Sequence, residues 1–303
     1  MILRVLAVAV ISLACAAAII LPKLKLGVPA ADSFSQKVKP EAVANADLRP
    51  VKKITYKDPP AVTADSIVVV DSKTGSTLYE KNVTLKHFPA SVAKLVTALV
   101  ALEKCLPADV VIVGTVEKEG TQMGLAASDK VTVENLLYGL LINSGNDAAA
   151  VLADNCSNSG EKFVQSMNEK AQNLGMQNSH FMNPTGFDNN FQYSTAGDLA
   201  KLGNVAISNP LIAKIVATKS TVVTNVSGTK SYYLENVNEL LGKVEGIQGI
   251  KTGQTVGALE NLVTKTTRGG NAVVVVVLGS KDRFLESKNL IEWAFDNFNW
   301  VLD

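Results

Sequence analysis

The sequence predicts a mixed α/β domain of the α+β type, with strands near its two ends and helices between them. Runs rich in β-branched residues occur early, at residues 66–70 and 76–80, and again late, at residues 259–264 and 272–278. The segment between them carries apolar residues at helical spacing. The chain has 303 residues, 47% of them hydrophobic, so it is long enough to bury a sizeable core.

The first 25 residues are predicted to be a signal or membrane anchor. Arg4 precedes an uncharged apolar run, residues 5–21, which Pro22 and two lysines close. Such a segment directs a chain out of the cytoplasm. Its length is at the short limit for spanning a bilayer, and residues 28–30, Val-Pro-Ala, form a candidate cleavage site. We expect a retained anchor at the extracytoplasmic face of the membrane, or a secreted protein if the segment is cleaved.

Residues 26–60 are predicted to be a flexible linker, and residues 61–303 the folded domain. Six of the ten prolines fall between Pro22 and Thr63, and aromatic residues are few there. This composition is typical of solvated spacers. The chain therefore reads as one domain on a tether.

Composition excludes several classes of function. The net charge is only +1 and there is no basic run, which argues against nucleic-acid binding. Two histidines and three scattered cysteines make no recognisable metal site, and there is no glycine-rich phosphate loop, so we expect no metal or cofactor. His180 is expected to be a structural hydrogen-bonding residue and His87 a surface residue.

Six helices are predicted: residues 91–104, 133–141, 147–155, 161–174, 195–207 and 286–297. Thr195 and Asp198 give the fifth a start that resembles a capping box. Cys105 follows the first helix and Cys156 ends the third. An exported chain meets an oxidising compartment, in which these two cysteines can form a disulfide. We nevertheless expect two separately buried thiols.

Ser91 and Lys94 are a candidate nucleophile and base at the start of an apolar helix that Pro89 introduces. Residues i and i+3 share a helix face, so the ammonium can reach the hydroxyl. A lysine can take the serine proton once desolvation or a second cation lowers its pKa, and a helix N-terminus favours the developing negative charge. Ser-x-x-Lys also occurs at residues 159–162 and 227–230, so the pattern alone is weak.

Two further motifs accompany this pair. Residues 143–147, Asn-Ser-Gly-Asn-Asp, form a polar loop between two apolar helices. Residues 251–254, Lys-Thr-Gly-Gln, precede strand-like sequence. Lys-Thr-Gly also occurs at residues 73–75, where Gly75 serves a hairpin turn between two β-rich runs. Order and context favour the copy at Lys251 as the functional one.

With Ser-x-x-Lys at Ser91, Ser-Gly-Asn at Ser144 and Lys-Thr-Gly at Lys251, in this order, the chain resembles the D-alanyl-D-alanine carboxypeptidases among the low-molecular-mass penicillin-binding proteins. The resemblance covers residues 61–303 and includes residues 180–186, His-Phe-Met-Asn-Pro-Thr-Gly. It implies the β-lactamase and penicillin-binding-protein fold, in which an antiparallel sheet of the first and last strands is flanked by helices and joined to a mostly helical subdomain.

The resemblance also implies roles for the motif residues. Ser91 would be the acylated nucleophile and Lys94 its general base or proton shuttle. Ser144 would relay a proton to the leaving amine, and Asn146 would orient Lys94 and the substrate amide. Lys251 would add the positive charge that holds Lys94 closer to neutral. Read alone, Ser144 and Asn146 would be ordinary helix-capping residues and Lys251 a solvated strand lysine.

On the substrate side, the resemblance implies five binding residues: Thr252, Gly253, Gln254, Lys281 and Arg283. Thr252 would bind the terminal carboxylate, helped by the basic residue that the family often has beyond the last strand, here Lys281 or Arg283. The backbone N–H groups of Ser91 and Gln254 would form the oxyanion hole. The family often has a histidine where this chain has Gln254, which matters little if only its backbone acts.

The resemblance implies a serine carboxypeptidase that trims the terminal D-alanine of peptidoglycan stem pentapeptides and is inhibited covalently by β-lactams. A serine β-lactamase of the same fold is disfavoured, because class A enzymes deacylate with a glutamate and residues 175–197 contain none. A D,D-endopeptidase would use the same residues. A noncatalytic wall-binding protein is the alternative from another class, and the intact motifs argue against it.

Overall fold

The computed structural model describes residues 48–116, 118–157 and 159–302. The predicted anchor, residues 1–25, and most of the predicted linker lie outside the described residues. No helix among those described is long and apolar enough to cross a bilayer.

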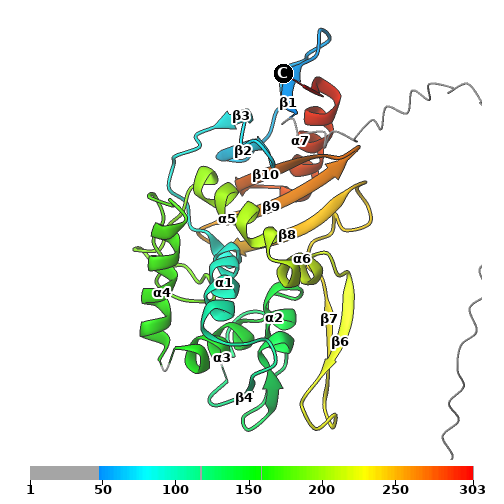
Figure 1. Cartoon of the computed structure of the whole chain (residues 1–303). Coiled ribbons are helices and arrows are strands. Elements are labelled where there is room, and N and C mark those ends of the chain that lie inside the picture. Colours follow the sequence, from blue (N-terminus) through cyan, green and yellow to red (C-terminus); the bar gives the residue numbers. More distant parts are fainter. Residues whose placement is uncertain (1–47, 117, 158, 303) are drawn as a thin grey trace, which may run out of the picture. The chain divides into compact units, whose positions relative to one another are not determined.

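A five-stranded antiparallel sheet joins the two ends of the described chain, as predicted (Figure 1). Its strands are β2 (Ser66–Asp71), β3 (Thr77–Lys81), β8 (Ile247–Thr255), β9 (Leu259–Arg268) and β10 (Asn271–Ser280). Their order in the sheet is β3-β2-β10-β9-β8. All four predicted strands are confirmed, and β8, which contains the Lys-Thr-Gly motif, forms one edge of the sheet.

The helices lie mainly between β3 and β8 in the chain and form the predicted helical subdomain (Figure 1). They are α1 (Lys94–Lys104), α2 (Val133–Leu141), α3 (Asn146–Cys156), α4 (Gly160–Asn173), α5 (Ala196–Ser208), α6 (Pro210–Val216) and α7 (Arg283–Asn297). The Thr195 hydroxyl accepts a hydrogen bond from Asp198 N, so the predicted cap of α5 is confirmed. The sequence reading missed α6, whose two turns are too short to show a helical period.

Both faces of the central strands are buried, which explains their near-continuous valine runs. Val69 and Val275 point toward α7, where they join a core that contains Trp293. Val68 and Val274 point the other way, into the larger core shared with the helical subdomain. The sheet therefore links α7 on one face to the helices on the other (Figure 1).

The described part of the predicted linker, residues 48–60, is folded against the domain, so that boundary is wrong. Strand β1 (Arg49–Lys52) pairs with the last strand, β11 (Phe298–Val301). The indole Nε1 of Trp293 donates to the carbonyl oxygen of Lys57 at 2.8 Å, and the Tyr56 ring packs edge-on against Trp293 and Phe298. These partners lie about 240 residues away in the chain, so the local composition carries no sign of them.

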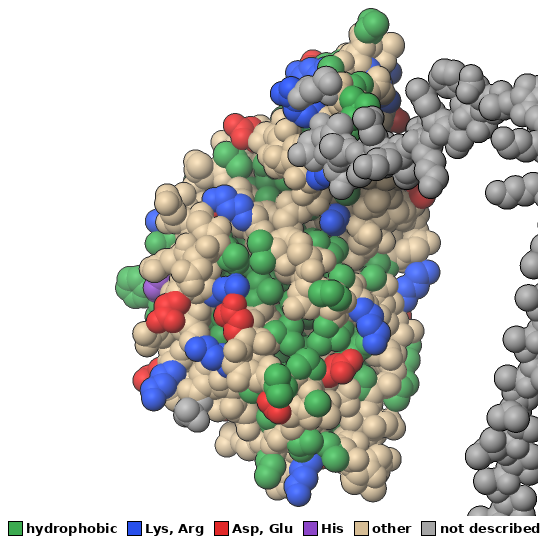
Figure 2. Space-filling model, viewed as in Figure 1, with side chains coloured by type: hydrophobic (Ala, Val, Ile, Leu, Met, Phe, Trp, Pro, Cys, Tyr) green, Lys and Arg blue, Asp and Glu red, His purple; other side chains and the backbone are tan. Residues whose placement is uncertain are grey.

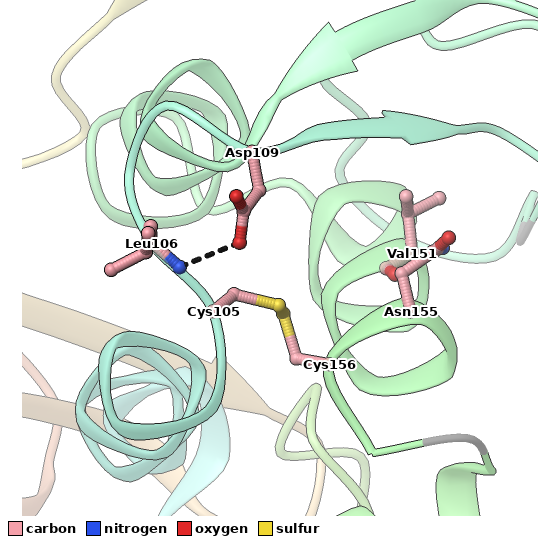
Figure 3. Close-up of a disulfide and its surroundings, with 6 residues drawn as sticks. All are labelled: Cys105, Leu106, Asp109, Val151, Asn155 and Cys156. Carbon is pink, nitrogen blue, oxygen red and sulfur yellow. Dashed lines mark hydrogen bonds between the residues drawn. A yellow bond between two sulfur atoms is a disulfide. The ribbon is translucent and has the colours of Figure 1, made fainter.

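Cys105 and Cys156 form a disulfide, so the expectation of two separate thiols is wrong (Figure 3). Their Cα atoms are 5.6 Å apart, within the ordinary range for a disulfide. Cys105 directly follows α1 and Cys156 is the last residue of α3. The bond therefore ties together the far ends of the two helices whose first residues are Lys94 and Asn146.

Two smaller antiparallel strand pairs lie outside the main sheet: β4 (Val110–Ile112) with β5 (Lys130–Thr132), and β6 (Ser220–Thr224) with β7 (Ser231–Glu235). Within the main sheet, a hairpin joins β2 to β3 through residues 73–75, where Gly75 adopts φ +73°. The hairpin-turn interpretation of this first Lys-Thr-Gly copy is therefore confirmed.

The two histidines have structural contacts. His180 Nδ1 donates to the carbonyl oxygen of Phe191 at 2.8 Å, as expected of a structural residue. His87 was expected on the surface, but it is half-buried, and its Nε2 lies 2.8 Å from Ser66 Oγ. Burial lowers the pKa of His87, with a smaller opposing effect from Asp65.

On the face shown in Figure 2, basic and acidic side chains are interspersed. This pattern differs from the continuous basic surface that grips nucleic acid.

Candidate active site

The nucleophile and its lysine lie at the junction of a 3-10 turn and a helix. Residues Ala90–Ala93 form the turn and Lys94 begins α1, so one turn of backbone separates Ser91 from Lys94. The distance from Lys94 Nζ to Ser91 Oγ is 2.9 Å. The predicted nucleophile and base are thus in direct hydrogen-bond contact, as a proton transfer requires.

The ammonium group of Lys94 is fully buried and has three oxygen acceptors. Besides Ser91 Oγ, it donates to Asn146 Oδ1 at 2.7 Å and to the carbonyl oxygen of Thr185 at 2.6 Å. Burial lowers the pKa of Lys94 well below its usual value, Lys251 lowers it further, and Asp147 partly offsets both. A lysine in this setting is prepared to act as a neutral base.

The turn at residues 183–186 supplies the Thr185 carbonyl. Asn183 Oδ1 accepts hydrogen bonds from Gly186 N at 2.7 Å and Phe187 N at 3.0 Å, which fixes the turn. Gly186 has φ +88°, and a Cβ at this position would overlap the carbonyl of Ala90. Only glycine allows the turn to approach the nucleophile so closely.

The Ser-Gly-Asn motif lies in the loop between α2 and α3. Asn146 N donates to the carbonyl oxygen of Thr121 at 2.7 Å, and its Nδ2 donates to that of Glu119 at 2.9 Å. These two bonds leave the Oδ1 atom to face Lys94. Ser144 has φ +65° and makes no capping bond to α3. The ordinary helix-cap interpretation of both residues is therefore wrong.

Lys251 reaches the same cluster from β8. Its Nζ donates to Ser144 Oγ at 3.0 Å and to the carbonyl oxygen of Thr252 at 3.0 Å. Burial, followed by the charge of Arg283, lowers the pKa of Lys251 to about 7. Lys251 is fully buried, which excludes the interpretation of a solvated strand lysine.

The rest of the motif forms a wall beside the nucleophile. A Cβ on Gly253 would lie 3.0 Å from Ser91 N and 3.0 Å from Ala90 Cβ, so glycine allows β8 to pass close to the turn. Thr252 is buried next to it. Strand β8 ends the sheet order, so one of its edges has no strand partner and can pair with an extended peptide.

Arg283, and not Lys281, is the basic residue that the structure brings to this motif. Its guanidinium donates to the carbonyl oxygen of Gly253 and to Gln254 Oε1, each at 3.2 Å. Its Nε is buried and has no hydrogen-bond partner among the described residues. Lys281 is exposed, and its backbone N–H donates to Thr63 Oγ1 at 3.0 Å.

Sequence reasoning missed the groups that hold the motifs in place. The carbonyl oxygens of Glu119, Thr121 and Thr185 carry no side-chain signal. Asp188 was also missed, although its carboxylate accepts from Thr255 Oγ1 at 2.7 Å and Gly257 N at 3.0 Å and ties the end of β8 to the loop after Gly186. An acidic residue in a loop has no distinctive sequence pattern.

Comparison with known proteins agrees with this geometry. Residues 53–282 match the family model described as D-alanyl-D-alanine carboxypeptidase. The D-alanyl-D-alanine carboxypeptidase DacF of Bacillus subtilis is 30% identical over 269 residues, which cover 86% of this chain and 67% of the relative. The D-alanyl-D-alanine carboxypeptidase of Streptomyces sp. strain K15 is 35% identical over 239 residues, covering 73% of this chain and 82% of the relative. The chain spans about two thirds of the length of the Bacillus subtilis relative.

Two solved structures share the fold over most of their length. The Streptomyces K15 DD-transpeptidase has a TM-score of 0.74 at 31% identity, with 79% of this chain and 100% of that chain covered. The D-alanyl-D-alanine carboxypeptidase of Mycobacterium tuberculosis H37Rv has a TM-score of 0.76 at 30% identity, with 81% and 96% covered. The chain therefore belongs to the D-alanyl-D-alanine carboxypeptidase family of serine peptidases.

Proposed function

We propose that this chain removes the terminal D-alanine from peptidoglycan stem pentapeptides through an acyl-enzyme on Ser91. The observation that carries this proposal is the buried Lys94 ammonium, 2.9 Å from Ser91 Oγ and lowered in pKa. The family relationship supports the same reaction. No other group among the described contacts of Ser91 Oγ could take its proton.

Acylation follows from this geometry. Neutral Lys94 takes the hydroxyl proton as Ser91 Oγ bonds to the carbonyl carbon between the two D-alanines. The negative charge on the carbonyl oxygen is stabilised by the backbone N–H groups of Ser91 and Gln254, which are fixed before the reaction. The C–N bond then breaks, and the proton returns to the leaving amine from Lys94 or through Ser144, which Lys251 contacts at 3.0 Å.

Deacylation requires a water that adds to the ester and releases Ser91 Oγ, which regains a proton. Residues 175–197 contain no glutamate, so this chain lacks the base that class A β-lactamases use against the penicilloyl ester. A β-lactam should therefore form a long-lived adduct on Ser91, which makes β-lactams covalent inhibitors and disfavours penicillin hydrolysis.

The free carboxylate of the substrate supplies specificity. Thr252 lies in the motif strand β8, and the guanidinium of Arg283 contacts the same strand at the carbonyl oxygen of Gly253. A carboxylate bound there would place the preceding amide near Ser91. An amidated peptide would leave the guanidinium without its ion-pair partner, and losing one partner of a buried charge pair costs about 2 to 5 kcal/mol.

We also propose that the apolar residues 5–21 export the chain and hold it at the extracytoplasmic face of the membrane. The length and flanking charges of this run support the proposal, and fractionation of cells followed by N-terminal sequencing tests it. An intact N-terminus in the membrane fraction would support the anchor, and a shortened chain in the soluble fraction would support secretion.

The test of the activity compares three substrates: a pentapeptide that ends in D-Ala-D-Ala, its C-terminal amide, and a cross-linked wall dimer. The product of each cleavage is measured: D-alanine from the free acid, D-alanine amide from the amide, and the two separated stem peptides from the dimer. Ser91→Ala is the control for background hydrolysis. We expect release from the free acid at least roughly a hundredfold faster than from the amide. Equal rates on acid and amide, or preferential cutting of the dimer, would move the assignment to an endopeptidase.

A further inference from the structure

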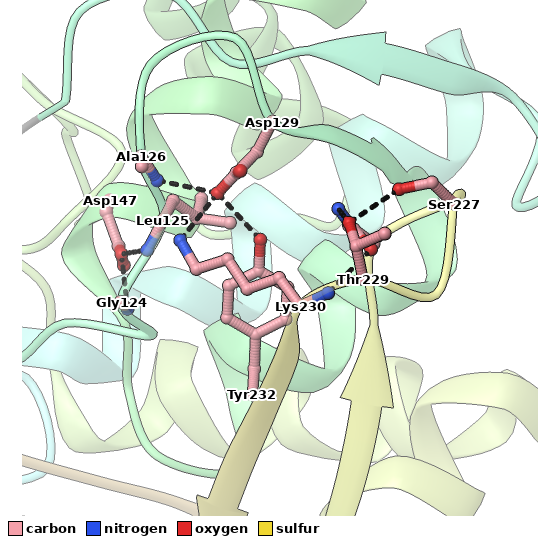
Figure 4. Close-up of polar contacts among 10 residues, drawn as sticks. Gly124, Leu125, Ala126, Asp129, Asp147, Ser227, Thr229, Lys230 and Tyr232 are labelled. Carbon is pink, nitrogen blue, oxygen red and sulfur yellow. Dashed lines mark hydrogen bonds and ion pairs between the residues drawn. The ribbon is translucent and has the colours of Figure 1, made fainter.

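Asp147 directly follows Asn146 in the sequence, and its carboxylate is fully buried. Its Oδ1 accepts from Met123 N at 2.7 Å and Ala148 N at 2.9 Å, and its Oδ2 accepts from Gly124 N at 2.8 Å and Leu125 N at 3.0 Å. Figure 4 shows the carboxylate turned toward Gly124 and Leu125. Four backbone donors thus satisfy a charge that would otherwise be costly to bury.

The segment that Asp147 holds is the one that orients Asn146. Residues 123–125 supply three of those four donors. Two to six residues before them, the carbonyl oxygens of Thr121 and Glu119 accept from Asn146 N and Nδ2 respectively. A Cβ on Gly120 would overlap Asn146 Nδ2, so the segment lies tight against the amide. Movement of residues 119–125 would therefore turn the Oδ1 that binds Lys94 at 2.7 Å.

Asp147 also carries a negative charge that acts on the buried Lys94 ammonium. The charged groups that act on Lys94 are Lys251 on β8, which lowers its pKa, and Asp147 on α3, which raises it. The direct hydrogen-bond partners of Lys94, namely Ser91, Asn146 and the Thr185 carbonyl, are uncharged. Asp147 is therefore the negative charge in this cluster that favours the ammonium form.

We propose that Asp147 is a positioning residue for acylation, which holds residues 119–125 against Asn146 and whose fixed charge sets the pH range in which Lys94 becomes a base. It acts through Asn146 and Lys94 and touches no reacting atom. The inference rests on the proposed acylation of Ser91 and extends it to the control of the base.

The experiment measures the second-order rate constant for acylation by a fluorescent penicillin between about pH 5 and 9, for the wild-type protein and for Asp147→Asn. The amide nitrogen cannot accept the bonds that Oδ2 accepts from Gly124 N and Leu125 N. We expect the rate constant to fall about tenfold or more for these losses. Loss of the negative charge disfavours the Lys94 ammonium, so the acid limb of the pH–rate profile, where the rate rises as Lys94 loses its proton, should move toward lower pH.

A matched control is Asp129→Asn. Asp129 is a carboxylate of the same subdomain, and its Oδ2 accepts from Ala126 N, Lys230 Nζ and Tyr232 OH, each at 2.7 Å (Figure 4). Its loss should lower thermal stability and leave both the acylation rate and the acid limb unchanged. An equal limb shift in both variants would assign the effect to general loosening of the fold and overturn the proposal.

The variant Asp147→Glu separates the two parts of the proposal and decides the matter if Asp147→Asn does not fold. Its charge remains while the extra methylene displaces the carboxylate, so we expect a lower rate with the limb near its wild-type position. A wild-type rate in this variant would contradict positioning, and an acid limb shifted toward lower pH as in Asp147→Asn would contradict the charge effect. Wild-type acylation at Ser91 in the same assay distinguishes failure of the inference from failure of the proposed function.

Discussion

The disulfide gives a quantitative prediction about stability. In Cys105→Ser, the chain loses a cross-link that closes a loop of 51 residues (Figure 3). Loss of loop-closure entropy in the unfolded state for this length corresponds to about 4 kcal/mol at about 25 °C. We therefore expect the free energy of unfolding, measured by urea denaturation without reductant, to fall by about 2 to 4 kcal/mol, the range found for native disulfides.

Activity should largely survive this loss. The disulfide joins the C-terminal ends of α1 and α3, whereas Lys94 and Asn146 lie at their N-terminal ends, about 16 Å away along each 11-residue helix. Acylation by penicillin should stay within about threefold of wild type at a temperature where the variant is folded. The double variant Cys105→Ser with Cys156→Ser should match the single one and controls for a new free thiol. A change in unfolding free energy below about 1 kcal/mol, or wild-type protein with both thiols free, would refute the reasoning.

Two further variants test the site. Lys94→Arg should fold, but its rate constant for acylation by penicillin should fall at least about a hundredfold, because arginine stays protonated. A wild-type rate constant in stopped-flow fluorescence would exclude the general-base role. Gly253→Ala should reduce the same rate constant about tenfold or more, because its Cβ would lie 3.0 Å from Ser91 N. The melting temperature should change little. An unchanged rate constant would show that β8 can move away from the nucleophile.

The strands, the long helices and the motif residues could be predicted because their signals are local. Val68–Val70 and Val273–Val277 carry the composition of buried strands, and Ser91 and Lys94 are one helical turn apart whatever surrounds them. The resemblance to the family implies that Lys251 lies near this pair, and its effect on the pKa of Lys94 and its contact with Ser144 agree with that implication.

The remaining features depend on partners that are distant in the chain. Strand β1 forms because it pairs with β11. Its own residues show no more alternation of apolar and polar side chains than a linker would. The disulfide depends on the distance between the C-terminal ends of α1 and α3. The lengths of the two helices do not determine that distance. The choice between Lys281 and Arg283 depends on where α7 begins relative to β8. Asp147 reads as an ordinary first-turn acidic residue until its backbone donors are seen.

The central claim is that Ser91 is the acylated nucleophile. Intact-protein mass spectrometry after incubation with a penicillin should show one adduct per chain in the wild-type protein, and peptide mapping should place it on the peptide that contains Ser91. The Ser91→Ala variant should show none while keeping the wild-type melting temperature, because its side chain contributes only the 2.9 Å contact with Lys94 Nζ among the described side-chain bonds. An adduct of equal yield in Ser91→Ala would contradict acylation at Ser91 and place the nucleophile at another residue.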